Sequence, residues 1–166
     1  MQTMHNHLTW KSAQLNLTQL AELTSCMADA SILGMKIGLS GAMGAGKTQL
    51  VRLLMQALSC TDEVSSPTYA IHHVYLTTAG EVDHYDLYRL GPDEMADLEL
   101  EYMSPSRTIL IEWWQNYPEL AKVLDLCITL EQGDTQSTRR LTLQGLTAQG
   151  RAWVEKLALL WAKQED

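Results

Sequence analysis

The sequence predicts an α/β protein in which helices cover a mixed central sheet, and three sets of segments indicate this fold class. A short β-rich segment at residues 35–40 runs directly into a glycine-rich stretch, which a helical segment at 47–58 follows. Residues 108–111 form a continuous apolar run, as in strands buried inside parallel sheets. Two further β-rich segments, at 70–78 and 81–85, are close enough to form an antiparallel hairpin. Alternating helices and strands of both kinds are typical of an α/β sandwich.

The remaining segments fit the same architecture. Ser12 precedes apolar residues that recur at three- and four-residue steps, which predicts a capped amphipathic helix ending before Gly34. Pro92 is typical of the first turn of a helix. Thr147 is expected to cap a final helix that gathers its large apolar residues, Trp153, Val154, Leu157, Ala158 and Trp161, on one face. Two more strands are expected at residues 123–130 and 139–143, around a turn at Gly133-Asp134.

The chain has the size of one compact domain, with 166 residues and a mass of 18.6 kDa, so residues 1–166 are predicted to form a single domain. A chain of this length buries roughly 70% of the surface that its unfolded form exposes, and it needs no disulfide or metal to fold. The three cysteines, Cys26, Cys60 and Cys127, form no C-x-x-C pair, which argues against a disulfide framework and a zinc site. Each is expected to be a small buried residue in a reducing compartment.

The charge balance is acidic: 12 basic and 20 acidic residues give a formal net charge of −8, and no segment concentrates basic residues. Direct nucleic-acid binding is therefore disfavoured as the main function, because such binding depends on neutralising phosphates, whereas a basic protein partner is compatible with the charge. The longest apolar stretch, around residues 157–162, is much shorter than the roughly 20 residues of a membrane span. The first ten residues also lack the order of a signal peptide, so we expect a cytoplasmic protein without membrane association.

The glycine-rich stretch Gly41-Ala42-Met43-Gly44-Ala45-Gly46-Lys47-Thr48 matches the pattern G-x-x-x-x-G-K-[ST] at every fixed position. Glycines allow backbone N–H groups to point inward, and the N-terminus of the following helix adds about half a positive charge. Such a nest fits a polyphosphate, with Lys47 reaching the β- and γ-phosphates and the Thr48 hydroxyl ligating magnesium. The alternative is a flexible glycine turn before an ordinary helix, which the strand before and the helix after disfavour. The sequence thus predicts a three-layer P-loop NTPase sandwich with a mixed central sheet.

Two carboxylates are candidates for the acid that a P-loop site needs to orient its magnesium ion at the end of a neighbouring strand. Glu112 ends the apolar run at 108–111, where a buried strand would deliver its side chain to the phosphate edge of the sheet. Asp86 follows the strand that ends in His84-Tyr85. For each residue, the alternative is a surface carboxylate at the end of a strand.

Thr68 is a candidate contact for the terminal phosphate. It belongs to the string Ser65-Ser66-Pro67-Thr68-Tyr69, between the P-loop helix and the hairpin. In GTPases this interval holds a mobile loop whose threonine senses the γ-phosphate through magnesium. A plain turn containing Pro67 is equally compatible with the spacing.

Four blocks of the sequence together resemble the signature set of the bacterial TsaE family of P-loop ATPases. They are Gly41 to Thr48, Ser66-Pro67-Thr68-Tyr69, His84-Tyr85-Asp86-Leu87-Tyr88-Arg89, and Glu112-Trp113. The blocks occur in the order and at the spacing of the family. A P-loop alone would be weak support for any family, whereas the four blocks together are specific.

The resemblance implies a function that the composition does not indicate. TsaE-like proteins are the ATPase component of the machinery that makes N6-threonylcarbamoyladenosine in tRNA, beside the anticodon. They work with a TsaD-type transferase and its TsaB-type paralogue, and ATP hydrolysis supports repeated turnover of the complex. The resemblance therefore implies ATP and magnesium as cofactors, and tRNA as an indirect partner held by the other proteins. The acidic charge agrees with this division of labour.

The resemblance also assigns roles to single residues. Thr48 and Glu112 would hold magnesium, and Asp86 would position or activate the attacking water, with Lys47 as the second catalytic residue. Because phosphoryl transfer has a loose transition state, most of the catalysis would come from placement and charge neutralisation. The nucleotide contacts expected are Gly41, Met43, Gly44, Ala45, Gly46, Lys47, Thr48 and Thr68, with Lys11 and the pair Arg139-Arg140 as candidates on the adenine or phosphate side. Trp113 is expected to pack beside the nucleotide or in the core. His84 and Arg89 are expected to orient Asp86 or to contact a partner, and for Arg89 the alternative is an exposed salt bridge.

The sequence departs from the family in the segment 93–103, which is more acidic than expected and lacks the glycine that the family often has there. Two other functions use the same P-loop. A small-molecule or nucleotide kinase would close an arginine-rich lid over the phosphoryl group, but Arg107 stands before Glu112 without a cluster of arginines around it, so no lid is evident. A GTPase-like switch is disfavoured because no N-K-x-D string is present.

Overall fold

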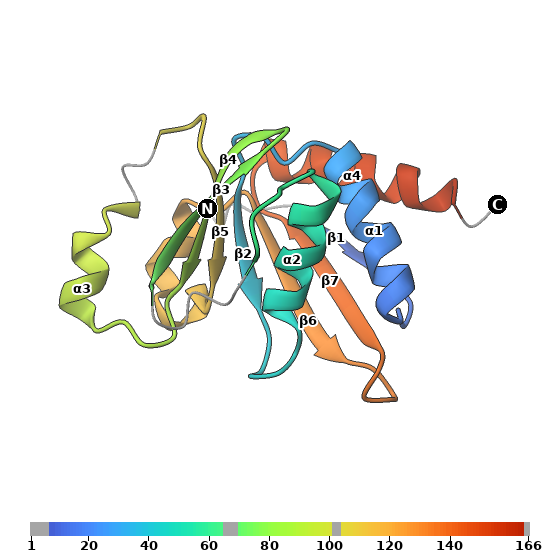
Figure 1. Ribbon diagram of the computed structural model, residues 1–166, viewed down its shortest axis with the longest axis horizontal. Helices are drawn as coiled ribbons and strands as arrows, with labels where there is room; N and C mark the ends of the chain where they lie inside the picture. The colour runs from blue at the N-terminus through green and yellow to red at the C-terminus, as the bar shows by residue number, and fades with distance from the viewer. Residues whose placement is uncertain (1–6, 65–69, 101–103, 165–166) are drawn as a thin grey trace, which may run out of the picture.

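The computed structural model describes residues 7–64, 70–100 and 104–164, and these residues fold around one seven-stranded sheet (Figure 1). The strands are β1 (Leu8–Lys11), β2 (Lys36–Ser40), β3 (His72–Thr77), β4 (Gly80–Asp86), β5 (Thr108–Glu112), β6 (Leu126–Gln132) and β7 (Arg139–Gly145). The helices are α1 (Leu17–Asp29), α2 (Lys47–Ala57), α3 (Pro92–Asp97) and α4 (Ala148–Ala162), with the 3₁₀ turns η2 (Trp114–Asn116) and η3 (Pro118–Lys122).

The sheet is mixed, as the sequence predicts. Its strand order is β1-β7-β6-β2-β5-β4-β3. The four central strands β6, β2, β5 and β4 are parallel, whereas β3 pairs with β4, and β7 with β6 and β1, in antiparallel fashion. All five residues of β5 are buried, which explains its continuous apolar run, because a central parallel strand is covered on both faces.

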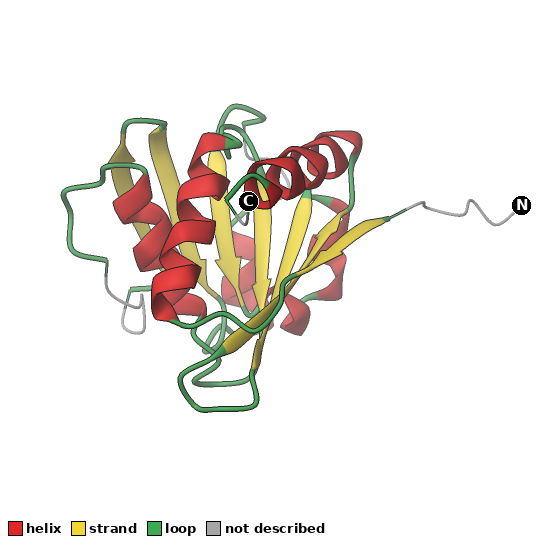
Figure 2. Ribbon diagram, turned by 90° about the vertical axis from the view of Figure 1, so that its right-hand side faces the viewer, coloured by secondary structure: helices red, strands yellow, loops and turns green. Residues whose placement is uncertain are grey.

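Two helical layers cover the sheet and complete the three-layer α/β sandwich (Figure 2). On one face, α1, α2 and α4 pack a large apolar core that includes Leu23, Leu50 and Leu157. The layer on the other face is thinner: α3 and the two 3₁₀ turns cover a second core around Leu87 and Ile111. The expected fold class is therefore confirmed.

The N-terminal segment differs from the sequence expectation. Residues 8–11 form β1, an edge strand whose short alternating pattern gave no signal, and Ser12 continues its pairing by accepting a hydrogen bond from the backbone N–H of Leu141 at 2.9 Å. The cap of α1 is Asn16, whose side chain accepts from the N–H of Gln19 at 2.9 Å while the Gln19 side chain accepts from the N–H of Asn16 at 3.0 Å. The capping box therefore places the start of the helix four residues beyond Ser12.

The other expected elements are present with small changes in their bounds. Pro92 is in the first turn of α3, and the Thr147 hydroxyl caps α4 by accepting from the N–H of Gly150 at 3.1 Å. β6 begins at Leu126 rather than at residue 123. Cys26 and Cys127 are buried and Cys60 is half-buried, all three as free thiols. None of the helices formed by the described residues is long and apolar enough to cross a membrane.

The topology brings three strand ends to one place. β2 leads into the glycine-rich loop and α2. Its neighbours in the sheet are β5 on one side and β6 on the other, so strands that follow β2 in the chain lie on both sides of it. In parallel register, Leu39 of β2 lies opposite Glu112 of β5, and Glu112 lies opposite Asp86 of β4. Such crevices at the carboxyl ends of parallel strands are the usual ligand sites of α/β sheets.

Candidate functional site

The loop between β2 and α2 has the backbone that the glycine pattern predicts. Gly46 precedes α2 with φ +106°, a left-handed conformation that residues with a side chain rarely adopt. Gly41 has φ +153°, and a Cβ atom there would lie 2.7 Å from the carbonyl oxygen of Leu130. The loop therefore requires glycine at both positions to place its N–H groups ahead of α2.

A cavity of about 400 Å³ opens beside this loop. This volume falls in the range of small-molecule and cofactor sites. The residues that line it come from the loop, the start of α2 and the ends of β4 and β5, and they include Met43, Gly44, Gly46, Lys47, Thr48, Asp86, Glu112 and Trp113. Ile71, Gln49, Tyr88 and Arg89 complete the wall. The structure thus brings together in one cavity most of the residues selected from the sequence.

Lys47 is held against its own loop. The side chain is only 5% exposed, and its Nζ donates to the carbonyl oxygens of Gly41 at 2.7 Å and Ala42 at 3.1 Å. The ammonium also lies 4.2 Å from the centre of the Trp113 ring, within the range of a cation–π contact. Burial lowers the pKa of Lys47 below its ordinary value, and the charges of Glu112 and Asp86 oppose this shift. The lysine is thus a cation placed at the floor of the cavity.

Thr48 and Glu112 meet directly across the site. The Thr48 hydroxyl donates to Glu112 Oε1 at 3.2 Å, and Nε2 of His84 lies 2.8 Å from the same oxygen. Glu112 and His84 are 2% and 0% exposed. The end of β5 therefore presents a buried carboxylate to the first turn of α2, where its neighbours hold it by two hydrogen bonds.

Asp86 ends β4 beside Glu112. Its Oδ1 accepts a hydrogen bond from the backbone N–H of Tyr88 at 3.0 Å. Burial raises the pKa of Asp86, and the negative charge of Glu112 adds to the increase, while the Tyr88 N–H, His84 and Lys47 oppose it. A carboxyl group whose pKa is raised in this way is better matched to accept a proton than an exposed aspartate.

The donor set of the cavity fits a magnesium–nucleotide complex. The loop supplies N–H groups, a lysine and a helix N-terminus for phosphates, and Thr48, Glu112 and Asp86 supply hard oxygen atoms. Across the described residues, no group of three or more His, Cys, Asp or Glu side chains is arranged to hold a metal. Magnesium is commonly bound through one or two protein oxygens together with phosphates, rather than by a cage of side chains.

Among the expected nucleotide contacts that the structure describes, five are not part of the cavity wall: Gly41, Ala45, Lys11, Arg139 and Arg140. Lys11 lies on the edge strand β1 opposite Thr142, with an exposed side chain, and Arg140 is exposed and pairs with Asp134 at 3.0 Å. Both are placed away from the cavity wall. Thr68 lies outside the described residues. The structure does not bring Lys11 and Arg140 to the loop.

Arg139 and Ala45 support the loop from behind. Nε of Arg139 donates to the carbonyl oxygen of Ala45 at 2.7 Å, and the Ala45 side chain is buried under the loop. The arginine therefore contacts the loop backbone and not the cavity. Arg139 and Arg140 are adjacent in sequence, but the alternation of side chains along β7 sends the two guanidinium groups to different partners.

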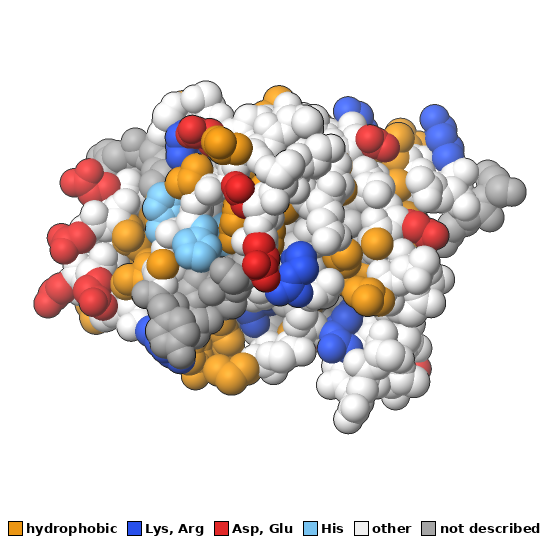
Figure 3. Space-filling view, viewed as in Figure 1, with side chains coloured by type: hydrophobic (Ala, Val, Ile, Leu, Met, Phe, Trp, Pro, Cys, Tyr) orange, Lys and Arg blue, Asp and Glu red, His pale blue; other side chains and the backbone are white. Residues whose placement is uncertain are grey.

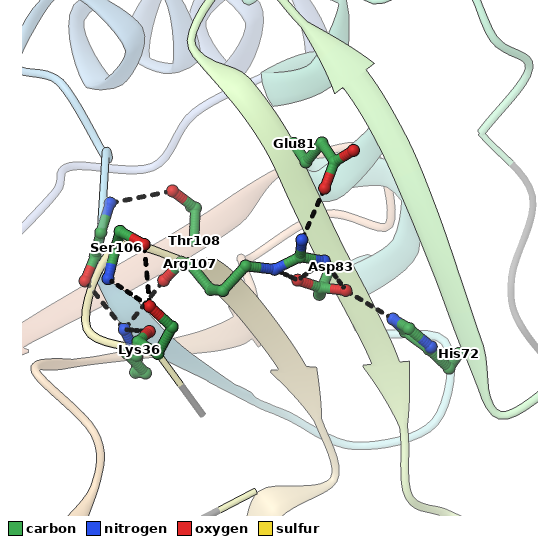
Figure 4. A network of polar contacts seen from close by, with 9 residues as sticks. Lys36, His72, Glu81, Asp83, Ser106, Arg107 and Thr108 are labelled. Carbon is green, nitrogen blue, oxygen red and sulfur yellow. Dashed lines mark hydrogen bonds and ion pairs between the residues drawn. The ribbon is translucent and has the colours of Figure 1, made fainter. Parts of the chain in front are cut away.

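Arg107 lies at the opposite end of β5 from the cavity and is engaged there by two acids (Figure 4). Its Nε donates to Asp83 Oδ2 at 2.7 Å and its Nη1 to Glu81 at 2.5 Å, while Asp83 Oδ1 also lies 2.7 Å from Nε2 of His72. A lid arginine must be able to reach the transferred phosphoryl group. Arg107 is at the wrong end of the strand for this, so it does not serve as the arginine of a kinase lid.

The comparisons with known proteins agree with the geometry. The family model described as threonylcarbamoyl adenosine biosynthesis protein TsaE matches residues 12–141, which is most of the chain. A relative from Streptomyces coelicolor, named tRNA threonylcarbamoyladenosine biosynthesis protein TsaE, is 36% identical over 141 residues, covering 81% of this chain and 93% of the relative. A protein of the same name from Haemophilus influenzae is 31% identical over 108 residues, covering 64% of this chain and 68% of the relative.

The fold has also been observed in a solved structure. The crystal structure of Bacillus subtilis YdiB superimposes with a TM-score of 0.70 and covers 98% of this chain and 99% of its own, at 20% sequence identity. At that identity the likeness concerns the fold, whereas the family model and the two relatives concern the sequence. On the sequence evidence, this chain belongs to the TsaE family of P-loop nucleotide-binding proteins.

Proposed function

We propose that this chain binds ATP with magnesium in the cavity beside Lys47 and hydrolyses it, as the subunit that supports threonylcarbamoyladenosine modification of tRNA. The observation that carries the proposal is the direct hydrogen bond from the Thr48 hydroxyl to the buried Glu112, next to a glycine loop that ends in Lys47. This arrangement is the pairing of P-loop hydroxyl and strand-end acid on which nucleoside triphosphatases depend. Family membership supports the tRNA modification role.

In this proposal the residues of the site divide the work. The N–H groups of the loop and the Lys47 ammonium bind and orient the phosphates, and Lys47 neutralises charge on them. Thr48 and Glu112 would hold magnesium, which when bound neutralises the charge that develops on the β- and γ-phosphates. Asp86 orients the attacking water and accepts its proton at a carboxylate oxygen. Trp113 and Tyr88, whose rings pack against each other, form part of the cavity wall.

The proposed partners are a TsaD-type transferase and its TsaB-type paralogue. ATP hydrolysis by this chain would support repeated turnover of their complex, and tRNA would be held by the partners. A net charge of −8 supports this division, since an acidic chain repels the tRNA backbone. This role places the chain in the cytoplasm, where tRNA is modified.

Calorimetry and phosphate release test the proposal. The wild-type chain is expected to bind ATP with magnesium, and Lys47→Ala to abolish binding, while Lys122→Ala on the exposed turn η3 serves as a control for loss of a positive charge. Unchanged affinity in Lys47→Ala would refute the nucleotide site. Slow release of inorganic phosphate with water as the only acceptor supports an ATPase, whereas phosphate transfer that requires an added acceptor would establish a kinase.

A binding experiment tests the partners. The immobilised chain is expected to retain the purified transferase pair in an ATP-dependent manner, and Lys47→Ala to lose this dependence. Retention that is identical with ATP, with ADP and without nucleotide would contradict a role for the nucleotide in the complex.

A further inference from the structure

His84 occupies an unusual place for a histidine. It lies on β4, between β5 and the edge strand β3, completely buried on the face that α2 covers. Its Nε2 lies 2.8 Å from Oε1 of Glu112, and no described residue forms a hydrogen bond with its Nδ1. Tyr75 on β3 borders the ring, with the two ring centres 6.0 Å apart. A fully buried polar ring with a single polar partner requires a physical explanation.

The hydrogen-bonding rules assign the proton of this ring. Glu112 as a carboxylate only accepts hydrogen bonds, so the contact at 2.8 Å requires the proton on Nε2 of His84. Nδ1, which forms no hydrogen bond with a described residue, takes no part in holding Glu112.

One oxygen of Glu112 therefore has two donors. Oε1 accepts from Nε2 of His84 and from the hydroxyl of Thr48, which is 3.2 Å away. Because the Thr48 hydroxyl donates its hydrogen bond to Glu112, the lone pairs of its oxygen remain available to bind a cation. The direction of this hydroxyl depends on where Oε1 lies, and His84 fixes Oε1 from the side of β4.

We infer that His84 is a positioning residue of the magnesium site: through the hydrogen bond from its Nε2, it fixes the Glu112 carboxylate that orients the Thr48 hydroxyl. The inference rests on the proposed function and deepens it. Residues that form a hydrogen bond with a metal ligand hold that ligand in place, and removing one of them typically reduces metal affinity or activity 10- to 100-fold. A role in packing alone would be served equally well by an apolar side chain of the same size.

Calorimetry of ATP binding, with magnesium and with EDTA, separates the two roles in four proteins. His84→Leu removes the donor and keeps an apolar side chain, so the gain in ATP affinity on adding magnesium is expected to fall about tenfold or more. Binding in EDTA should change little, because the loop and Lys47 are intact. His84→Gln retains an N–H donor at the place of Nε2 and is expected to restore most of the magnesium effect. His73→Leu is the matched control, since His73 is paired with His84 across β3 and β4 and its Nδ1 lies 3.3 Å from the Tyr75 hydroxyl.

The outcomes distinguish this inference from the proposed function. If the wild-type chain binds ATP equally well with magnesium and with EDTA, the proposed magnesium site and the role of His84 fail together. If the wild-type chain shows the magnesium effect and His84→Leu shows it undiminished, only the inference fails. A loss of affinity in EDTA as large as the loss in magnesium would mean general damage to the site, and would also overturn it.

A second measurement needs no variant. Long-range ¹H–¹⁵N correlation spectra of the nucleotide-free wild-type chain are expected to show a hydrogen on Nε2 of His84. A tautomer protonated on Nδ1 alone would contradict the hydrogen bond to Glu112 and overturn the inference, whether or not the variants fold.

Discussion

The ammonium group of Lys47 lies under the indole ring of Trp113, 4.2 Å from the ring centre. Trp113 follows Glu112 at the end of β5 and adopts φ +61°, a left-handed conformation that is uncommon for a bulky residue. Its ring also packs against Tyr88, with the ring centres 4.8 Å apart. Strained conformations of this kind persist where the surrounding structure requires them. Here the turn carries the ring from the end of the strand to the P-loop lysine.

This contact makes Trp113 a reporter of the site. Phosphates bound in the loop would draw the Lys47 ammonium away from the ring, so intrinsic fluorescence is expected to change on addition of ATP. Trp113→Phe should abolish most of the change, while Trp161→Phe, in the distant helix α4, should preserve it. A full response in Trp113→Phe would show that the signal does not come from Trp113 and would contradict its use as a reporter of the site.

Asp86→Asn is expected to separate binding from hydrolysis. Loss of a positioned base typically reduces the rate about 10²- to 10⁴-fold, whereas the phosphate contacts do not involve Asp86 and removal of its charge does not oppose an anion. The measurement is steady-state phosphate release beside calorimetric ATP affinity. Asp97→Asn, on the exposed surface of α3, controls for the loss of a negative charge. Full hydrolytic activity of Asp86→Asn would refute the role proposed for this residue.

Glu99→Gly is expected to stabilise the fold. Glu99 follows α3 with φ +47°, in the acidic segment where the sequence lacks the glycine often found in this family. Glycine adopts this left-handed conformation without strain, but it also gives the unfolded chain more conformational entropy. The relief of strain in the folded chain should be the larger of these two effects, so the free energy of unfolding should rise by about 1 kcal/mol. Urea denaturation measures the change.

The acidic surroundings allow a control for charge. Exposed acidic side chains gather over α3, on the left of the space-filling view (Figure 3). Glu119→Gly, on the nearby exposed turn η3, removes a similar charge without a positive φ, and is expected to leave stability equal or lower. If both variants were stabilised equally, relief of charge repulsion and not of backbone strain would be the cause.

Tyr85 should make the protein less stable in alkali. Burial, with the charge of Asp83 adding to it and that of Arg107 opposing it, raises the pKa of Tyr85 to about 12 from the ordinary 10.0. Above pH 10 the unfolded chain loses this proton before the folded chain does, so the contribution of Tyr85 to stability falls as the pH rises from 10 to 12. The loss between pH 8 and pH 11 is about 1 kcal/mol by this linkage.

Comparison of variants isolates this contribution. Tyr85→Phe lacks the ionisable hydroxyl, so its stability should fall less between pH 8 and pH 11 than that of the wild-type chain, whatever its stability at pH 8. Tyr88→Phe, whose side chain is 47% exposed, should follow the wild-type curve. Urea titrations at the two pH values give one difference in stability for each of the three proteins, and equal differences for all three would contradict the raised pKa.

The local features of this protein follow from the sequence alone. The glycine pattern, the strand before it and the helix after it lie within 24 residues, from 35 to 58, and the physical requirements of a phosphate-binding loop act over that same distance. The buried strand β5 and the cap of α4 at Thr147 are likewise encoded by neighbouring residues. The mixed sheet could be predicted because its hairpin and its parallel strands have different sequence patterns.

The tertiary structure decided the rest, because strand pairing depends on residues far apart in the chain. The parallel register places Asp86 opposite Glu112 and brings His84 to the Glu112 carboxylate, 28 residues away in sequence. The edge strand β1 is too short for its pattern to be read, and its pairing with β7 holds Lys11 away from the cavity. Sequence alone therefore determined which chemical groups this protein carries around its P-loop, and only the packing of the sheet determined which of them meet there.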